Sequence, residues 1–217
     1  MPTVTDKFNK RTFWVKENLS YAEPNFRAKK CARMIAELSK GERCDLLDVG
    51  CGPVALRKVV GSNVKYHGID MAIHHPDPYL REVDFSQNPI SFDNKGFDFV
   101  VALGVFEYMG RFQATKFEEI SRILKPNGKF IMSYVNFQHY RRRIYDMYNN
   151  VQSIAEMRQG LERTFTVDRC FPECHHWRHK QPGSLALPGL QLKLELSVPL
   201  LSPLLAVEYF FVCSRRG

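Results

Sequence analysis

The sequence predicts an α/β protein with a Rossmann-like, doubly wound and mostly parallel sheet that is flanked by helices and carries an antiparallel C-terminal strand. Short apolar segments alternate with segments of helical spacing, which is typical of βαβ units with right-handed crossovers. The strand that begins at Phe97 (FDFVVAL) is apolar almost throughout, as strands covered on both faces are. A Gly-x-Gly turn follows the first apolar strand directly, in LLDVGCG at 46–52.

The first half of the chain supplies four strands and two helices. Residues 21–40 place apolar side chains near helical spacing, and Gly41 follows as a stop signal. A second, shorter helix is expected at 54–60. The expected strands are CDLLDVG at 44–50, VKYHGID at 64–70, a shorter REVDF at 81–85 and the run from Phe97.

The second half continues the alternation and then changes character. Residues 113–124 are helical in pattern, and LKPNGKFIMSYV at 124–135 supplies a Pro-Asn-Gly turn and a fifth strand. A helical segment at 139–164 is followed by strands at 165–171 (FTVDRCF) and 207–214 (VEYFFVCS). There is no internal repeat, so we expect one domain over residues 1–217.

Composition limits the class of protein. Hydrophobic residues make up 44% of the chain and charged residues 25%, the balance of a soluble globular protein. No apolar run reaches about 18 residues, so we expect no membrane span. The N-terminal lysines are not followed by an apolar stretch, and we expect no secretory signal. The six cysteines are therefore interpreted as reduced thiols, and the protein as cytoplasmic.

The formal net charge of +8 comes from two segments. Residues 1–43 carry ten Lys/Arg against five Asp/Glu, and residues 139–180 carry eight against five. Such an excess is typical of a nucleic-acid surface, or of a pocket rim for an anionic small substrate. A solvated basic face explains it equally well.

The glycine turn at 50–52 predicts a ligand site. In an open α/β sheet, ligands bind outside the carboxyl ends of the strands, and glycines let the backbone approach the ligand closely. GCGPVA also satisfies Gly-x-Gly-x-x-Ala, so a nicotinamide dinucleotide is one candidate. A turn that needs glycine only for its backbone geometry is the plainer alternative.

Three acids near the strand ends change the expected ligand. Asp48 precedes Gly50 by two residues, where a carboxylate suits a positive amino group better than a pyrophosphate. Asp70 ends the second strand and can accept from ribose hydroxyls. Asp84 ends the third strand beside Phe85 and can accept from an adenine amino group while the ring packs on an apolar side chain. Adenosine bearing an amino acid fits all three, which predicts S-adenosylmethionine as the cofactor.

The motifs LLDVGCG, GID, VDF, FDFVVALGVFEYM and EEISRILKPNGKFIMS resemble, in order and spacing, those of class I S-adenosylmethionine-dependent methyltransferases. The resemblance covers about residues 44–135 and implies that the first acid and the glycines hold the methionine end, the second-strand acid the ribose and the third-strand acid the adenine. The family often has a third glycine where this chain has Val54, which we expect to tighten the methionine pocket. The implied cofactor-binding residues are Asp48, Gly50, Gly52, Asp70, Met71, Asp84, Phe85, Leu103 and Gly104.

The resemblance also bears on the methyl acceptor. LGVFEYM lacks the Asn/Asp-Pro-Pro-aromatic motif of enzymes that methylate exocyclic amines of nucleic acids, and it resembles the version in members that act on small metabolites, sugars and natural products. In such enzymes, acceptor groups come from an N-terminal lid and from residues after the fifth strand. The candidate substrate-binding residues are Tyr21, Tyr108, Tyr140, His175 and His176.

His139, just beyond the fifth strand, is the candidate catalytic base. Methyl transfer is an in-line displacement, so most of the catalysis is positioning, and a base is needed only if the nucleophile is a hydroxyl. A histidine on the surface of a helix start is the plainer alternative for His139.

The segment CFPECHHWRH at 170–179 holds two cysteines and three histidines, enough side chains for a zinc site. Its spacing does not match the common two-plus-two arrangements of zinc ligands. We therefore assign no metal and expect an aromatic and histidine wall of the substrate pocket instead.

We expect a helical lid at 1–43, a cofactor-binding core at 44–135, and an acceptor-binding region with the final strands at 136–217. The expected reaction moves a methyl group to an oxygen or nitrogen atom of a small-molecule or glycan-like acceptor, with anionic acceptors among the candidates. The alternatives are an RNA methyltransferase that uses the basic face and a non-catalytic S-adenosylmethionine-binding protein. A nicotinamide-dependent oxidoreductase ranks below them. The acceptor's identity and the oligomeric state stay open.

Overall fold

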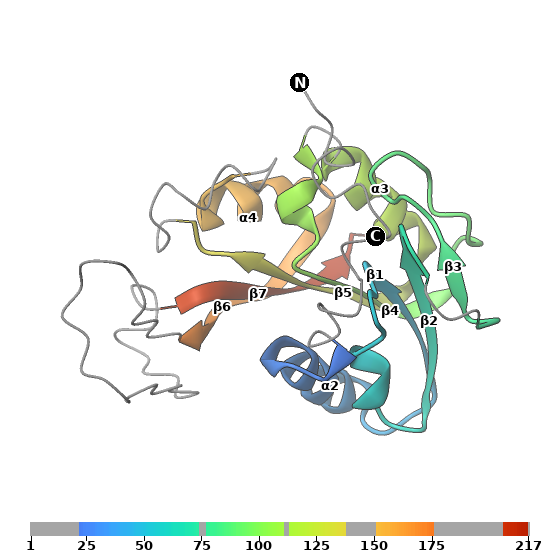
Figure 1. The fold of residues 1–217 in the computed structure, drawn as a ribbon. Coiled ribbons are helices and arrows are strands. Elements are labelled where there is room, and N and C mark those ends of the chain that lie inside the picture. Colours follow the sequence, from blue (N-terminus) through green and yellow to red (C-terminus); the bar gives the residue numbers. More distant parts are fainter. Residues whose placement is uncertain (1–21, 74–76, 111–112, 138–150, 176–205, 217) are drawn as a thin grey trace.

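The computed structural model describes residues 22–73, 77–110, 113–137, 151–175 and 206–216. A seven-stranded sheet runs through the molecule in the order β3-β2-β1-β4-β5-β7-β6, with helices on both faces (Figure 1). Neighbouring strands are parallel from β3 to β5, whereas β7 is antiparallel to both β5 and β6, which confirms the predicted fold class. The strands are β1 (Cys44–Val49), β2 (Val64–Asp70), β3 (Leu80–Glu82), β4 (Phe97–Leu103), β5 (Leu124–Val135), β6 (Phe165–His175) and β7 (Ala206–Arg215).

The strand order reverses beside β1, and this reversal positions the site. The chain runs outward from β1 to β2 and β3, and then returns to place β4 on the other side of β1. At Asp48, β1 pairs with Gly68 of β2 on one side and with Val101 of β4 on the other. The connections that follow β1 and β4 therefore diverge at the carboxyl edge of the sheet, which leaves a crevice between them.

Helix α2 (Phe26–Ser39) covers one face of the sheet, and α3 (Gln113–Ile123) and α4 (Ile154–Glu162) cover the other (Figure 1). α2 begins after Asn25, whose side chain accepts a hydrogen bond from the amide of Ala28 at 3.1 Å, as helix N-caps do. Its buried side packs on β1 and β4 in one hydrophobic core. The second core lies under α3 and α4, where Phe106 stacks on Phe117 with ring centroids 4.7 Å apart.

The predicted helix at 54–60 is wrong. Only a single 3-10 turn, η3 (Leu56–Lys58), forms there. Val54 has a φ of 54°, a left-handed conformation that β-branched residues rarely adopt, and it interrupts the helical path directly after Pro53. The apolar spacing of this segment reflects burial against the core beside α2 and not a regular helix.

The third strand is also shorter than predicted, because it ends at Glu82 and not at Phe85. Beyond it, the side chain of Asp84 turns back on its own segment. Its Oδ1 accepts from the amide and the hydroxyl of Ser86 at 3.0 and 2.6 Å, and its carbonyl accepts from the amide of Asn88 at 2.8 Å. A local turn thus replaces the strand ladder.

Among the described residues, every helix is too short or too polar to cross a lipid bilayer. Within the same ranges, no three His, Cys, Asp or Glu side chains lie close enough together to hold a metal ion.

Candidate functional site

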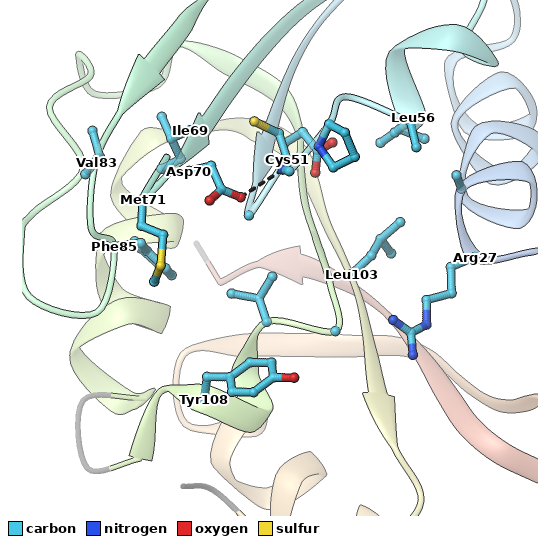
Figure 2. Close-up of a pocket in the computed structure, with 18 of the residues that line it drawn as sticks. Arg27, Cys51, Leu56, Ile69, Asp70, Met71, Val83, Phe85, Leu103 and Tyr108 are labelled. Carbon is cyan, nitrogen blue, oxygen red and sulfur yellow. Dashed lines mark hydrogen bonds between the residues drawn. The ribbon is translucent and has the colours of Figure 1, made fainter. Parts of the chain in front are cut away.

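A cleft of about 340 Å³ lies at the carboxyl ends of β1, β2 and β4, where the strand order reverses (Figure 2). The volume is within the range of small-ligand pockets. All nine predicted cofactor residues border this cleft: Asp48, Gly50, Gly52, Asp70, Met71, Asp84, Phe85, Leu103 and Gly104. The structure brings together side chains that are up to 56 positions apart in the chain, because parallel strands end at the same edge.

The glycine turn after β1 is built by its two glycines. Gly50 and Gly52 have φ values of 72° and 48°, in the left-handed region that favours glycine. A Cβ on Gly50 would lie 2.6 Å from Cγ2 of Val105, so a side chain has no room there. The amides of Gly50 and Cys51 both donate to the carbonyl of Ile69, at 2.8 and 3.1 Å, which ties the turn to β2. The backbone conformation of Gly50 and the close approach of Val105 therefore both require glycine at this position.

Asp48 is a buried acid with one hydrogen bond to a neighbouring strand. Only 4% of its surface is exposed, and its Oδ2 accepts from the hydroxyl of Tyr66 at 2.7 Å. Burial raises the pKa of Asp48 to about 7; the Tyr66 hydrogen bond lowers this pKa and the nearby Asp70 raises it. A cationic group bound beside Asp48 stabilises its charged form. This environment fits an ammonium group better than a phosphate.

Asp70, at the end of β2, faces the glycine turn (Figure 2). Its Oδ2 accepts from the amide of Gly52 at 2.8 Å, and its Oδ1 accepts from the amide of Ala72 at 3.4 Å. The carboxylate is therefore oriented by backbone groups on both sides, at the edge of the cleft. An acid held this way is pre-positioned to accept from vicinal hydroxyls.

An apolar wall borders the cleft beyond β2. The side chains of Met71, Val83 and Phe85 line this part of the cleft (Figure 2). Phe85 is held edge-to-face against Phe106, with ring centroids 6.3 Å apart. The surfaces fit a flat aromatic ligand such as adenine. Asp84 also borders the cleft, although its Oδ1 is engaged by Ser86.

Arg27 of α2 lies across the cleft from this apolar wall (Figure 2), and the sequence analysis missed it. Its Nε donates to Oε2 of Glu208 in β7 at 2.6 Å. Arg27 is the one cationic side chain among the described residues that line the cleft, against three carboxylates. Its chain neighbours Lys29, Lys30 and Arg33 make it look like part of a solvated face. No signal in the local sequence distinguishes Arg27 from these neighbours.

The other predicted residues divide into two groups. Tyr108, a candidate acceptor-binding residue, borders the cleft, and its role stays a prediction. His175 is the last residue of β6, but its side chain lies outside the described part. The remaining candidates, Tyr21, His139, Tyr140 and His176, also lie outside the described residues, so their roles stay predictions.

Solved structures with the same fold are numerous. One chain of the complex between the Haloferax volcanii Trm112 methyltransferase activator and its methyltransferase is 18% identical, with a TM-score of 0.69 over 99% of this chain and 98% of that one. The Pyrococcus horikoshii protein PH0226 is 16% identical, with a TM-score of 0.61 over 95% and 99%. The Burkholderia thailandensis 1,6-didemethyltoxoflavin-N1-methyltransferase, solved with its substrate and S-adenosylhomocysteine, is 10% identical, with a TM-score of 0.62 over 97% and 87%.

No curated protein sequence matches the chain significantly. The family described as "Methyltransferase domain", however, matches residues 22–170, well over half of the chain. The match includes the glycine turn, the three acids near the strand ends and the segment after β4. The chain therefore belongs to the class I S-adenosylmethionine-dependent methyltransferases.

Proposed function

We propose that this enzyme transfers a methyl group to an oxygen or nitrogen atom of a small-molecule or glycan-like acceptor. The observation that carries the proposal is one cleft that is bordered by the candidate cofactor residues and also by Tyr108 and Arg27. The segment after β4 forms a 3-10 turn, η4 (Phe106–Tyr108), and contains no Pro-Pro motif for an exocyclic amine of nucleic acid. The Burkholderia thailandensis neighbour, named for methylation of a small heterocycle, supports the same acceptor class.

Each cofactor-facing residue has a role that its surroundings support. Asp48 suits the ammonium group of the methionine end, and Asp70 suits the ribose hydroxyls. Met71 and Phe85 offer apolar surfaces for adenine. The cofactor, when bound, supplies a methyl group on a positively charged sulfur. What the chain then contributes is mainly alignment of the acceptor, together with exclusion of water.

His139 remains our proposed base for a hydroxyl acceptor. It lies four positions after the end of β5. Because β5 is parallel to β4 and β1, it ends at the edge of the sheet where the cleft lies. A neutral amine needs no base before it attacks, and His139 is dispensable in that case.

A screen with radiolabelled S-adenosylmethionine tests the proposal. Panels of small phenols, sugars, amines and carboxylic acids are compared with total RNA, and label transferred to each is counted. We expect label on a member of the small-molecule panels and none on RNA. The variant Asp70→Ala should lose the activity, whereas Asp93→Asn, which changes an exposed acid outside the cleft, should retain it. Label on RNA alone would overturn the proposed acceptor class.

A further inference from the structure

The two residues assigned to the adenine end of the cleft, Asp84 and Phe85, lie on a turn and not in a strand. β3 ends at Glu82, so no strand ladder holds them. The backbone folds back instead, and the carbonyl of Asp84 accepts from the amides of Gln87 and Asn88 at 3.1 and 2.8 Å. These hydrogen bonds stay within the turn. Its position relative to the rest of the fold therefore depends on contacts from outside.

Lys116 of α3 supplies such a contact. Its ammonium donates to the carbonyl of Asn88 at 2.7 Å and to Oε1 of Glu119 at 2.8 Å. The same nitrogen lies over the ring of Phe85, 5.0 Å from its centroid. An ammonium has three N–H groups, and a cation this close to an aromatic face is attracted to it. One nitrogen thus links the end of the turn, its aromatic ring and the helix.

Two more side chains of α3 bind the segment that follows the turn. Oε2 of Glu119 accepts from the amide of Ile90 at 2.8 Å. Arg122 donates to the carbonyls of Ile90 and Phe92 at 2.7 and 2.9 Å. Together with Lys116 these residues recur every three positions, so they lie along one side of the helix. The helix therefore holds the turn and the segment after it through a continuous series of hydrogen bonds.

The Lys116–Glu119 pair is enclosed, with side-chain exposures of 5% and 15%. Lysine is rarely buried unless it is paired, because an ammonium is costly to remove from water. Neither residue borders the cleft, whereas Phe85 does. Phe85 is also packed against Phe106, so its ring is held both by an aromatic neighbour and by a buried cation.

We propose that Lys116 and Glu119 are positioning residues that hold the ring of Phe85 as the surface on which adenine packs. Part of the protein's preference for an adenine-bearing ligand is then set by a charged pair on α3 that the ligand does not touch. This inference rests on the proposed function, because it assumes the adenosine-bearing cofactor in the cleft.

Calorimetry with two ligands isolates the adenine contact. S-adenosylhomocysteine and S-ribosylhomocysteine share the amino acid and the sugar, and only the first carries adenine. We expect the wild-type protein to bind the first about 10- to 100-fold more tightly, as for stacking of one base. Lys116→Met removes the ammonium and keeps a long apolar side chain. It should reduce this ratio about three- to tenfold. Glu119→Gln keeps an acceptor for the Ile90 amide and should reduce the ratio by less.

Lys29→Met is the matched control, because Lys29 is an exposed lysine of α2 that lies outside the cleft. It should keep the full ratio. A purely structural role of Lys116 would weaken both ligands by the same factor and leave the ratio unchanged, so the ratio separates positioning from stability. Melting temperatures are measured first, and if Lys116→Met does not fold, Glu119→Gln tests the same pair.

An unchanged ratio in the folded variant overturns the inference. Equal binding of the two ligands by the wild type also overturns it, because there is then no adenine contact to position. Failure of the wild type to bind S-adenosylhomocysteine would instead contradict the proposed function.

Discussion

Replacing Asp48 by asparagine should remove part of the pH dependence of stability of the ligand-free protein. Asp48 is 4% exposed, and burial raises its pKa to about 7. The ordinary aspartate pKa is about 3.9, so the folded protein retains a proton that the unfolded chain releases. This contribution to stability is complete below about pH 4 and is lost as the pH rises through about 7. Asparagine has the same shape, can accept from the Tyr66 hydroxyl, and does not titrate.

The size of the effect follows from the raised pKa. Between pH 6 and pH 8.5 the contribution of Asp48 falls by about 1.4 kcal/mol, the value of one pKa unit. Glu107, whose pKa burial also raises to about 7, adds a similar loss of the same sign. The wild type should therefore lose about 2–3 kcal/mol over this range, and Asp48→Asn about half of that. For a chain of this size, the difference between the two proteins corresponds to about 3–6 °C in Tm.

Differential scanning calorimetry of both proteins at pH 6, 7 and 8.5 measures this difference. Asp93→Asn serves as the control, because Asp93 is exposed and should leave the wild-type slope unchanged. Saturating S-adenosylhomocysteine should remove the Asp48 part of the slope, because its ammonium group favours the charged carboxylate. Parallel Tm curves for wild type and Asp48→Asn without ligand would show that the buried acid does not gain a proton, and the electrostatic description of the site would be wrong.

Three further predictions address the rest of the site. Asp70→Ala should weaken S-adenosylhomocysteine binding by about 1.5–3 kcal/mol in calorimetry. Asp70→Asn keeps an acceptor for the Gly52 amide, so in urea unfolding it should lose less stability than Asp70→Ala; equal losses of stability in the two variants would argue against the contact with the glycine turn. If the acceptor is a hydroxyl, His139→Ala should lower kcat by ~10²–10⁴-fold with cofactor affinity nearly unchanged, and an unaffected kcat would remove His139 from the mechanism. RNA binding, measured by fluorescence anisotropy, should be weak and should fall steeply with added salt; tight binding at physiological salt, with methylated RNA as product, would favour the RNA alternative.

The fold could be predicted because its signals are local. Buried strands such as β1 and β4 are nearly continuous apolar runs, and the glycine turn after β1 marks the point where the chain leaves the sheet. The gathering of the nine candidate cofactor residues at one cleft could be predicted for the same reason, since each lies at or just after the carboxyl end of a strand and these ends meet at one edge.

What could not be predicted depends on tertiary contacts or on unusual backbone. The apolar spacing of 54–60 indicated a helix, but Val54 adopts a left-handed φ of 54° that no residue-type preference anticipates. The position of Arg27 depends on Glu208, 181 positions away, and on the missing side chain of Gly104. No local pattern links three such residues, so the cleft's cation emerged only from the structure.

The measurement that tests the account most directly is a calorimetric titration of the wild-type protein with S-adenosylhomocysteine and, separately, with NAD. The acids at Asp48 and Asp70 and the apolar wall at Phe85 predict binding of one equivalent of S-adenosylhomocysteine and no binding of NAD. Tight NAD binding, with no heat from S-adenosylhomocysteine, would contradict the assignment of the cleft to a methyl-donor cofactor.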